Sequence, residues 1–584
     1  MSRLSTSKET ISSQRTTWIA FAALSLAANV PTLLNASVAS PAYLAACVAA
    51  QGITLYVVLL SFLRPRITLL VYGILLLFIF PFDAISIIGT NSPLSYGMIS
   101  ATLKTTPPEA FAQIKVNLHF IILFIAAITA YFIVLFRYIP WRFKLSPTAR
   151  FFAPIAALTC TLTITTIAAI PYANRTEQTK SRAVQTTTDK SFLLLFPIRD
   201  AKLISAYVKD EREIKEKIIS RQPFPDSLFK KLPGFDSSCI GILSIGETSR
   251  ACRWQLAGAE RQTNPRLIQR EDLFFYADAY SGSNLTEFSA PMYFSNDRPE
   301  KIRTWQSSPI LNEIFNARGI FTGLVTSQGY RSQWRATSFV LLTATSSASE
   351  LITSYGVEPH VPDMQLIAPV NEMLKSHSSP LFITFWGYGG HHDYTDRYPQ
   401  QDEVFTPANK KNMNNELNAF DNTIVHTDRV HDSLISMLEA TGKPAFLIYA
   451  ADHGETLYDV DGQNHYHGTM LFSHGEAHVP CFVWLSKQYI ARYPGIASAL
   501  VGNLSKPVQT IAVFHTVQHL MHCVGPDFDS TLSLASRSYH ANASRDGLNA
   551  NCELIPAPPY DSLERKRIDS VMAEQVQRHR YLLK

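Results

Sequence analysis

The chain has 584 residues, of which 46% are hydrophobic and 17% are charged, and its formal net charge is +5. This length is enough for two or more domains. The small net charge, without a basic stripe that carries interleaved aromatics, argues against a nucleic-acid partner. Hydrophobicity is unevenly distributed, because long charge-free runs fill the first third and the chain from Asp200 onward has the composition of a soluble protein.

Five segments of the N-terminal third are long and apolar enough to cross a bilayer as helices. They are Trp18–Ala36, Ala42–Leu63, Ile67–Ile88, Leu118–Phe136 and Phe152–Pro171. A secretory signal peptide would explain only the first, and no small-residue cleavage pattern follows it. We therefore predict an α-helical membrane domain of five spans over residues 1–171. Asp83 lies near the end of the third span, where we expect its carboxylate to reach the interface.

The basic residues of the loops predict the orientation of these spans. They concentrate before the first span and after the second and fourth, as Arg3, Lys8, Arg15, Arg64, Arg66, Arg137, Arg142, Lys144 and Arg150. Lys and Arg are enriched in cytoplasmic loops. The N-terminus is then cytoplasmic, and after five crossings the C-terminal part lies outside the cytoplasm.

Residues 172–234 are predicted to connect the membrane domain to the rest of the chain. This stretch is polar at Thr176–Lys190, apolar at Phe192–Pro197 and helical in pattern at Ala206–Ile219. Such alternation is typical of a segment that lies along the membrane interface. A solvated linker with one ordinary helix explains it equally well.

Five cysteines fall in the exported part, where disulfides are able to form. The pairs Cys239–Cys252 and Cys523–Cys552 are the ones we consider, although spacing alone does not fix connectivity.

Residues 235–584 have the pattern of an α/β domain with a largely parallel central sheet. Short apolar runs typical of buried strands occur at Ile240–Ile245, Gly319–Thr326, Leu381–Trp386, Ala445–Ala450 and Cys481–Leu485. Helical stretches such as Asn415–Ala440 separate several of them. Functional sites in such sheets gather outside the carboxyl ends of the strands, so the residues after each apolar run are the informative ones.

Polar residues follow three of these runs. They are Gly246-Glu247-Thr248, Gly389-Gly390-His391-His392-Asp393 and Asp452-His453-Gly454-Glu455, and a histidine-rich turn with His465, His467, His474 and His478 comes soon after. Ligation by Asp, Glu and His without a thiolate suits zinc, with manganese as the alternative. A metal at such a site makes a hydroxyl more acidic and offsets the charge on a phosphoryl group.

Each of these motifs is weak alone. A Gly-Glu-Thr after a strand is more often a helix-entry turn with threonine as the cap. Together, the three strand ends predict a metal site for phosphoryl chemistry.

The order of the motifs resembles the phosphoethanolamine transferases of Gram-negative envelopes, which belong to the alkaline phosphatase/sulfatase superfamily. The likeness extends to Arg397-Tyr398-Pro399, to His478-Val479-Pro480, and to Thr105-Thr106-Pro107-Pro108-Glu109-Ala110 in the loop after the third span.

The resemblance implies a role for each matching residue. It implies a metal site formed by Glu247, Thr248, Asp452 and His453, with Thr248 as the nucleophile that carries a phosphothreonine. It assigns His391 and His467 to catalysis and to the substrate phosphate or a second, weaker metal. It places Thr286 and Asn284 in contact with substrate, and Glu109 beside the ammonium group of the donor.

The implied enzyme is a monomer in the bacterial inner membrane with a periplasmic catalytic domain. It moves phosphoethanolamine from phosphatidylethanolamine to lipopolysaccharide. The stretch Ser249–Trp254 departs from the pattern of members that modify lipid A, which favours a core heptose over lipid A or Kdo as the acceptor. A glycerol-phosphate transferase, a sulfatase-like phosphohydrolase and a non-enzymatic membrane receptor or scaffold are the alternatives.

Overall fold

The structure is a computed structural model, and it describes residues 2–37, 42–90, 94–104, 114, 118–169, 196–328, 337–351, 362–377, 380–409, 412–458, 465–468, 472–541 and 545–583. The chain divides into two compact units, Met1–Lys209 and Asp210–Lys584. Helix α11 (Ile198–Ile219) begins in the first unit and ends in the second.

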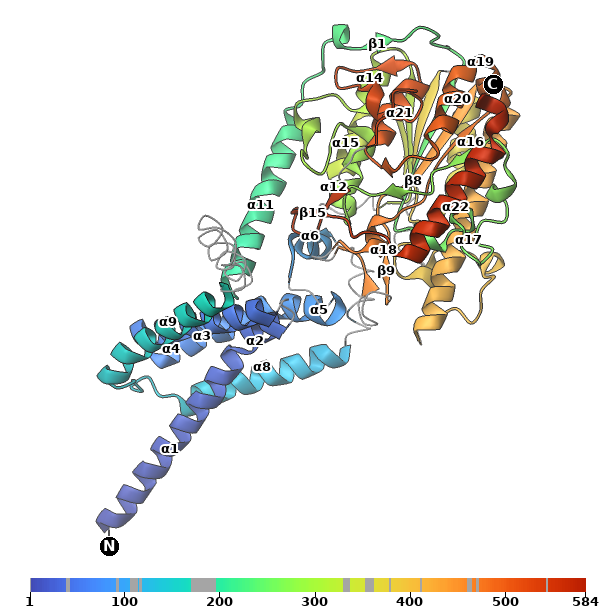
Figure 1. Cartoon of the computed structure of the whole chain (residues 1–584). Coiled ribbons are helices and arrows are strands. Elements are labelled where there is room, and N and C mark those ends of the chain that lie inside the picture. Colours follow the sequence, from blue (N-terminus) through green and yellow to red (C-terminus); the bar gives the residue numbers. More distant parts are fainter. Residues whose placement is uncertain are drawn as a thin grey trace. The chain divides into compact units, whose positions relative to one another are not determined.

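The first unit is helical. Its elements are α1 (Ser2–Ala28), α2 (Val30–Ser37), α3 (Ala42–Phe62), α4 (Pro65–Phe78), α5 (Phe80–Thr90), α6 (Tyr96–Lys104), α8 (Leu118–Tyr138) and α9 (Pro147–Ala169) (Figure 1). In the described part of the chain, four segments are long and apolar enough to cross a membrane, namely Gln14–Ser37, Leu44–Phe62, Leu118–Tyr138 and Pro147–Ile167. They match four of the predicted spans.

The predicted third span is bent. It consists of α4 and α5, which meet at an angle of 54° and make a fifth span if they cross together. Pro81 lies in the first turn of α5 and has no backbone N–H, so the hydrogen-bond ladder of α4 does not continue through it.

Asp83, near the end of the predicted third span, is fully buried within the first unit. The Nη2 atom of Arg199 lies 2.6 Å from its Oδ1, and Asn35 donates a hydrogen bond to its Oδ2 at 2.9 Å. Arg199 also pairs with its neighbour Asp200 at 2.5 Å. A carboxylate in apolar surroundings needs a counter-charge, and Arg199 supplies one within the protein.

The second unit is built on a seven-stranded sheet in the order β3-β11-β8-β2-β7-β5-β6. The strands are β2 (Ile240–Gly246), β3 (Leu273–Phe275), β5 (Phe321–Thr326), β6 (Ala348–Leu351), β7 (Leu381–Trp386), β8 (Ala445–Ala451) and β11 (Cys481–Leu485). The adjacent strands β8, β2, β7, β5 and β6 run parallel to one another, whereas β11 is antiparallel to both β8 and β3. The predicted parallel sheet is confirmed, with β3 and β6 as strands that the sequence pattern missed.

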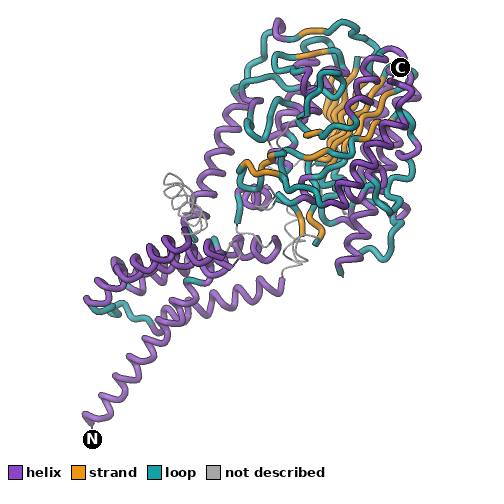
Figure 2. The backbone as a smooth tube through the Cα atoms, in the orientation of Figure 1, coloured by secondary structure: helices purple, strands orange, loops and turns teal. Residues whose placement is uncertain are grey.

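Helices cover both faces of this sheet (Figures 1 and 2). Each face has its own hydrophobic core. Ile242 of β2 belongs to a core that also includes buried residues of α16 (Ile367–Ser376), α17 (Met413–Ala440) and α22 (Ser562–Arg578). The next residue, Leu243, belongs to the core on the opposite face, which includes buried residues of α14 (Leu311–Asn316), α20 (Pro494–Asn503) and α21 (Ala512–Leu520). Successive side chains of a strand point to opposite faces, so a strand covered on both sides is apolar throughout.

Neither considered disulfide is present, since all seven cysteines are free. Cys239 and Cys252 flank β2 at its two ends, and a strand of seven residues spans about 23 Å. Bridged cysteines need Cα atoms within about 7 Å of each other. Cys523 is buried in β13 (Cys523–Val524), and Cys552 lies in the turn between β14 (Asp546–Leu548) and β15 (Leu554–Pro556).

The buried ion pair predicts a specific loss of stability. Replacing Arg199 with Met leaves the Asp83 carboxylate buried without its cation, and we expect the free energy of unfolding to fall by about 3–5 kcal/mol. Thermal unfolding of the detergent-purified chain measures this. Arg212→Met on the same helix, at an exposed position, is the matched control. Equal stability of the two variants would contradict the role of the pair.

Candidate metal centre

The turn after β2 holds Thr248 in a strained conformation. Its φ of 51° lies in the left-handed region, which is unusual for a residue with a branched side chain. Its backbone N–H donates to Asp452 Oδ1 at 3.1 Å, and the next N–H, of Ser249, donates to the His453 carbonyl at 2.9 Å. Strain of this kind persists where the surroundings over-determine it, which is common at functional sites.

The turn after β7 comes so close to this segment that it needs glycine. Gly389 has a φ of +49°, and a Cβ atom there would lie 2.5 Å from the Glu247 carbonyl oxygen. The N–H of Gly390 donates to that oxygen at 2.8 Å. The two strand ends are therefore joined directly.

Glu247, Asp452 and His453 form a buried cluster in which one ligand atom from each residue lies within 4.8 Å of the others. His453 Nε2 is 3.5 Å from Glu247 Oε1 and 3.4 Å from Asp452 Oδ2. His453 Nδ1 lies 2.9 Å from the Gly454 carbonyl, which only accepts, so Nδ1 carries the proton of the neutral ring. The lone pair of Nε2 then faces two carboxylates.

This donor set fits a divalent cation. Asp452 Oδ2 is buried and has no hydrogen-bond partner among the described residues. Burial and the nearby charge of Asp452 raise the pKa of Glu247 well above its usual range. Burial lowers the pKa of His453. A cation between these atoms would offset the repulsion of the carboxylates and engage the imidazole lone pair.

Two hydroxyl groups adjoin the cluster. Thr248 Oγ1 donates to Glu247 Oε1 at 3.1 Å, and Thr286 Oγ1 donates to the same oxygen at 3.2 Å. Thr286 Oγ1 also lies 3.2 Å from His453 Nε2. Asn284 is placed differently, since its side chain is fully buried and donates to Glu476 Oε1 at 3.0 Å.

Two predicted histidines lie beside the cluster. The ring of His467 is 4.1 Å from that of His453 and 5.9 Å from that of His391, measured between centroids. His467 Nδ1 lies 3.2 Å from Glu455 Oε1. Burial, Arg397 and His467 lower the pKa of His391 well below its usual range. His391 and His467 thus sit in environments of opposite charge.

The structure brings together seven of the nine predicted site residues. They are Glu247, Thr248, Thr286, His391, Asp452, His453 and His467. Glu109 lies outside the described residues. His392 turns elsewhere and pairs with Asp393 at 2.9 Å and Glu416 at 3.6 Å.

Two residues that the sequence analysis did not single out support the cluster. Gln328 Nε2 donates to Glu247 Oε2 at 3.1 Å and to the Gly387 carbonyl at 2.9 Å. Asp363 accepts from the N–H groups of Tyr388 and Gly389 at 2.8 and 2.9 Å. Gln328 follows the apolar run that forms β5, so the strand-end argument would have found it. Nothing in the sequence pattern marks Asp363.

Gln328 should contribute to metal affinity by fixing the free oxygen of Glu247. Loss of such an outer partner typically weakens binding about 10–100-fold, and we expect this of Gln328→Leu. Zinc titration against a competing chelator measures the dissociation constant. Gln400→Leu, at an exposed position, controls for the substitution itself. Unchanged affinity in Gln328→Leu would show that Glu247 needs no such support.

The chain is similar in sequence to known proteins. A family model described as Sulfatase matches residues 241–523. Phosphoethanolamine transferase EptA of Salmonella typhimurium (strain LT2) is 27% identical over 277 residues, which cover 44% of this chain and 48% of the relative. Kdo(2)-lipid A phosphoethanolamine 7''-transferase of Escherichia coli (strain K12) is 25% identical over 315 residues, covering 49% and 52%. The chain spans about half the length of the curated relatives that it matches.

Solved structures show the same fold. The integral membrane protein lipooligosaccharide phosphoethanolamine transferase A (EptA) from Neisseria meningitidis matches with a TM-score of 0.68 at 18% identity, covering 88% of this chain and 98% of that one. The C-terminal periplasmic domain of EcEptC from Escherichia coli, in complex with Zn, matches with a TM-score of 0.54 at 20% identity, covering 59% and 99%. The chain is therefore similar to the phosphoethanolamine transferases of the alkaline phosphatase/sulfatase superfamily.

Proposed function

We propose that the protein transfers phosphoethanolamine from phosphatidylethanolamine to lipopolysaccharide through a phosphothreonine at Thr248. The observation that carries this proposal is the Thr248 hydroxyl, which is held 3.1 Å from Glu247 in a turn bonded to Asp452 and His453. The names of the relatives support the phosphoethanolamine cargo and a lipid A or lipooligosaccharide acceptor. The finer preference for a core heptose over lipid A and Kdo rests on the departures at Ser249–Trp254.

The proposed domain plan assigns residues 1–171 to the membrane, 172–234 to the connector and 235–584 to catalysis. The cytoplasmic N-terminus follows from the loop charges, and the periplasmic site accords with the periplasmic domain named for EcEptC. Donor and acceptor are both lipid-anchored, so a membrane-tethered site raises their effective concentration and limits their orientations. The enzyme is proposed to act as a monomer.

Zinc is the proposed cofactor, held by Glu247, Thr248, Asp452 and His453, with manganese as the alternative. The Zn complex of EcEptC supports zinc, as does the donor set of this cluster. Bound there, the metal makes a neighbouring hydroxyl more acidic and offsets negative charge on a phosphoryl group.

In the first half-reaction, Thr248 Oγ1 attacks the phosphorus of the donor. Its hydrogen bond to Glu247 Oε1 orients the hydroxyl and gives its proton an acceptor. A Thr248 O–P bond forms, the bond from phosphorus to the diacylglycerol oxygen breaks, and diacylglycerol leaves. Thr286, which shares the same carboxylate oxygen, keeps Glu247 in place.

The surroundings of the two histidines suggest a division of roles. Glu455 lies behind His467 Nδ1 and stabilises a protonated imidazole there, so His467 is suited to protonate the departing alkoxide. Burial and Arg397 lower the pKa of His391, and its Nδ1 lies 2.8 Å from the His392 carbonyl, so the neutral ring presents the Nε2 lone pair and is better suited to hold a second, weaker metal. In the second half-reaction His467 takes the proton of the acceptor hydroxyl, whose oxygen bonds to phosphorus as the Thr248 O–P bond breaks, and Glu247 returns the proton to Thr248 Oγ1.

Removing the nucleophile tests the proposal. Thr248→Ala should reduce phosphoethanolamine on lipopolysaccharide by at least about 10³-fold, because the proposal places the covalent bond to phosphorus on this hydroxyl. Mass spectrometry of lipid A and core oligosaccharide from cells carrying each variant measures the loss and locates the acceptor. Thr531→Ala, on an exposed turn, is the control. An undiminished level in Thr248→Ala would refute the nucleophile.

The transferred group is tested by supplying labelled phosphatidylethanolamine or labelled phosphatidylglycerol. Transfer of label from phosphatidylglycerol rather than from phosphatidylethanolamine would refute phosphoethanolamine as the transferred group.

The orientation has its own test. Protease added to spheroplasts should cleave the C-terminal domain and leave an N-terminal cytoplasmic tag intact, because positively charged loops stay inside. Immunoblotting against tags at both ends reads this out, and lysed spheroplasts show that the N-terminal tag is itself cleavable. Protection of the C-terminal domain in intact spheroplasts would contradict the periplasmic placement.

A further inference from the structure

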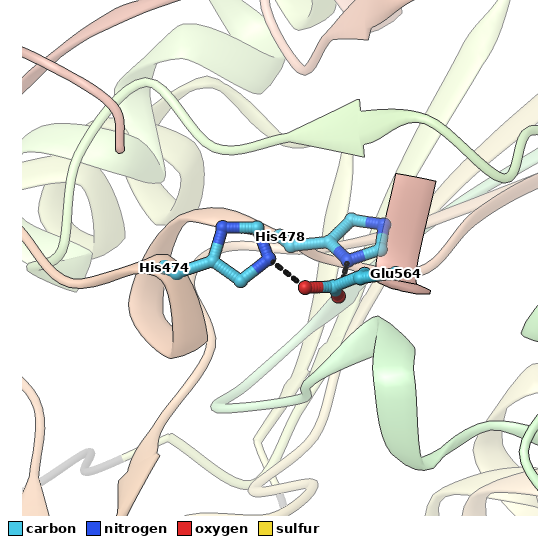
Figure 3. A group of neighbouring side chains, drawn as sticks. All are labelled: His474, His478 and Glu564. Carbon is cyan, nitrogen blue, oxygen red and sulfur yellow. Dashed lines mark hydrogen bonds and ion pairs between the residues drawn. The ribbon is translucent and has the colours of Figure 1, made fainter. Parts of the chain in front are cut away.

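A second group of metal-ligating side chains lies outside the cluster described above. His474 opens α18 (His474–Ala477), His478 follows that turn, and Glu564 lies in the first turn of α22. Figure 3 shows both imidazoles turned toward the Glu564 carboxylate. His474 Nε2 is 2.5 Å from Oε2, and His478 Nδ1 is 3.2 Å from Oε1. One ligand atom from each residue lies within 4.8 Å of the others.

The bonding of His478 requires a positive charge between its ring and Glu564. Its Nε2 lies 2.9 Å from the Ala277 carbonyl, so Nε2 must carry a proton. In the neutral ring the lone pair of Nδ1 then faces a carboxylate oxygen. Only a second proton or a cation makes that contact favourable. An imidazole whose outer N–H donates to a carbonyl while the other nitrogen faces a carboxylate is also the usual arrangement of a metal-bound histidine.

The surroundings hold these three side chains in place. The ring of Tyr560 packs 4.7 Å from His474 and 5.1 Å from His478, measured between centroids. The Tyr560 hydroxyl donates to Asp278 at 2.9 Å, and Arg565 on α22 pairs with the same carboxylate at 2.8 Å. The side chains of His478 and Glu564 are 3% and 12% exposed, and that of His474 is 24% exposed. The group is therefore largely buried at His478 and Glu564 and partly accessible to solvent at His474.

We propose that His474, His478 and Glu564 bind one zinc ion, at a site separate from Glu247, Asp452 and His453. Two imidazoles and one carboxylate form a zinc donor set that leaves a fourth position for water. A ligand set without thiolate, with nitrogen as the majority donor, favours zinc over magnesium or calcium. The inference does not depend on the transfer reaction.

The site would fix the segment that supports the first metal cluster. Gly454 N–H donates to the Glu476 carbonyl at 2.8 Å, and Glu455 N–H donates to the Gly475 carbonyl at 3.0 Å. The α18 turn is thus bonded to the loop that directly follows Asp452 and His453. A zinc ion joining α18 to α22 would hold that turn, which makes the three ligands positioning residues for the loop.

Metal content of the full-length, detergent-purified protein tests this. Glu564→Gln and His474→Ala should each lower the bound zinc by about one equivalent per chain relative to the wild type. Glu574→Gln, at an exposed position on the same helix, should leave the content unchanged. Zinc content equal to the wild type in both cluster variants would overturn the proposal and leave a protonated histidine–glutamate contact.

A second measurement guards against misfolding and against loss of the first site. In a background of Asp452→Asn, added zinc should still raise the unfolding temperature of the chelator-treated protein. Adding Glu564→Gln to that background should abolish the rise. A rise that persists in the double variant would assign the ion elsewhere. Because neither measurement uses a lipid substrate, failure here leaves the proposed transfer untouched, and the converse also holds.

Discussion

The rest of the second unit depends on two buried carboxylates that the sheet forces side by side. Strands β2 and β8 pair in parallel with Gly246 opposite Ala451, so the residues that follow them, Glu247 and Asp452, emerge at the same edge. Like charges in a buried site repel strongly, and an unpaired buried charge is costly. The arrangement is therefore stable only with a cation or a proton between them. The lone pair of His453 Nε2 points to a cation, and so does the Asp452 Oδ2 atom, which has no hydrogen-bond partner among the described residues.

The same constraint shapes the turn that carries Thr248, the proposed nucleophile. The turn that carries Glu247 is joined to the end of β8 by the hydrogen bond from the Thr248 N–H to Asp452. Thr248 adopts a left-handed backbone conformation in this turn. The same geometry turns the hydroxyl toward Glu247. His391 and His467 differ in their charged neighbours. The Glu455 carboxylate lies next to His467, and the Arg397 guanidinium lies near His391. One buried charge cluster thus accounts for the strain, the close glycine turn and the asymmetry of the acid–base groups.

Much of the fold could be read from the sequence because strands buried on both faces are uniformly apolar and spans need long apolar helices. The strand-end rule found Glu247, Thr248, Asp452 and His453 for the same reason, since parallel register brings those ends together. The sequence analysis missed contacts between residues that lie far apart in the chain. Arg199 meets Asp83 across 116 positions, and Asn284 meets Glu476 across 192, so neither pairing has a local signal. The bend between α4 and α5 and the separation of Cys239 from Cys252 likewise depend on the three-dimensional path.

The most direct test of the account is to trap the covalent intermediate. Purified protein incubated with phosphatidylethanolamine, in the absence of any acceptor, should accumulate phosphoethanolamine on the peptide that contains Thr248. Tandem mass spectrometry of the quenched, digested protein locates the modified residue. The account predicts the adduct on Thr248, and its absence from chelator-treated protein. An adduct on another residue, or release of diacylglycerol from the donor with no adduct at all, would contradict it.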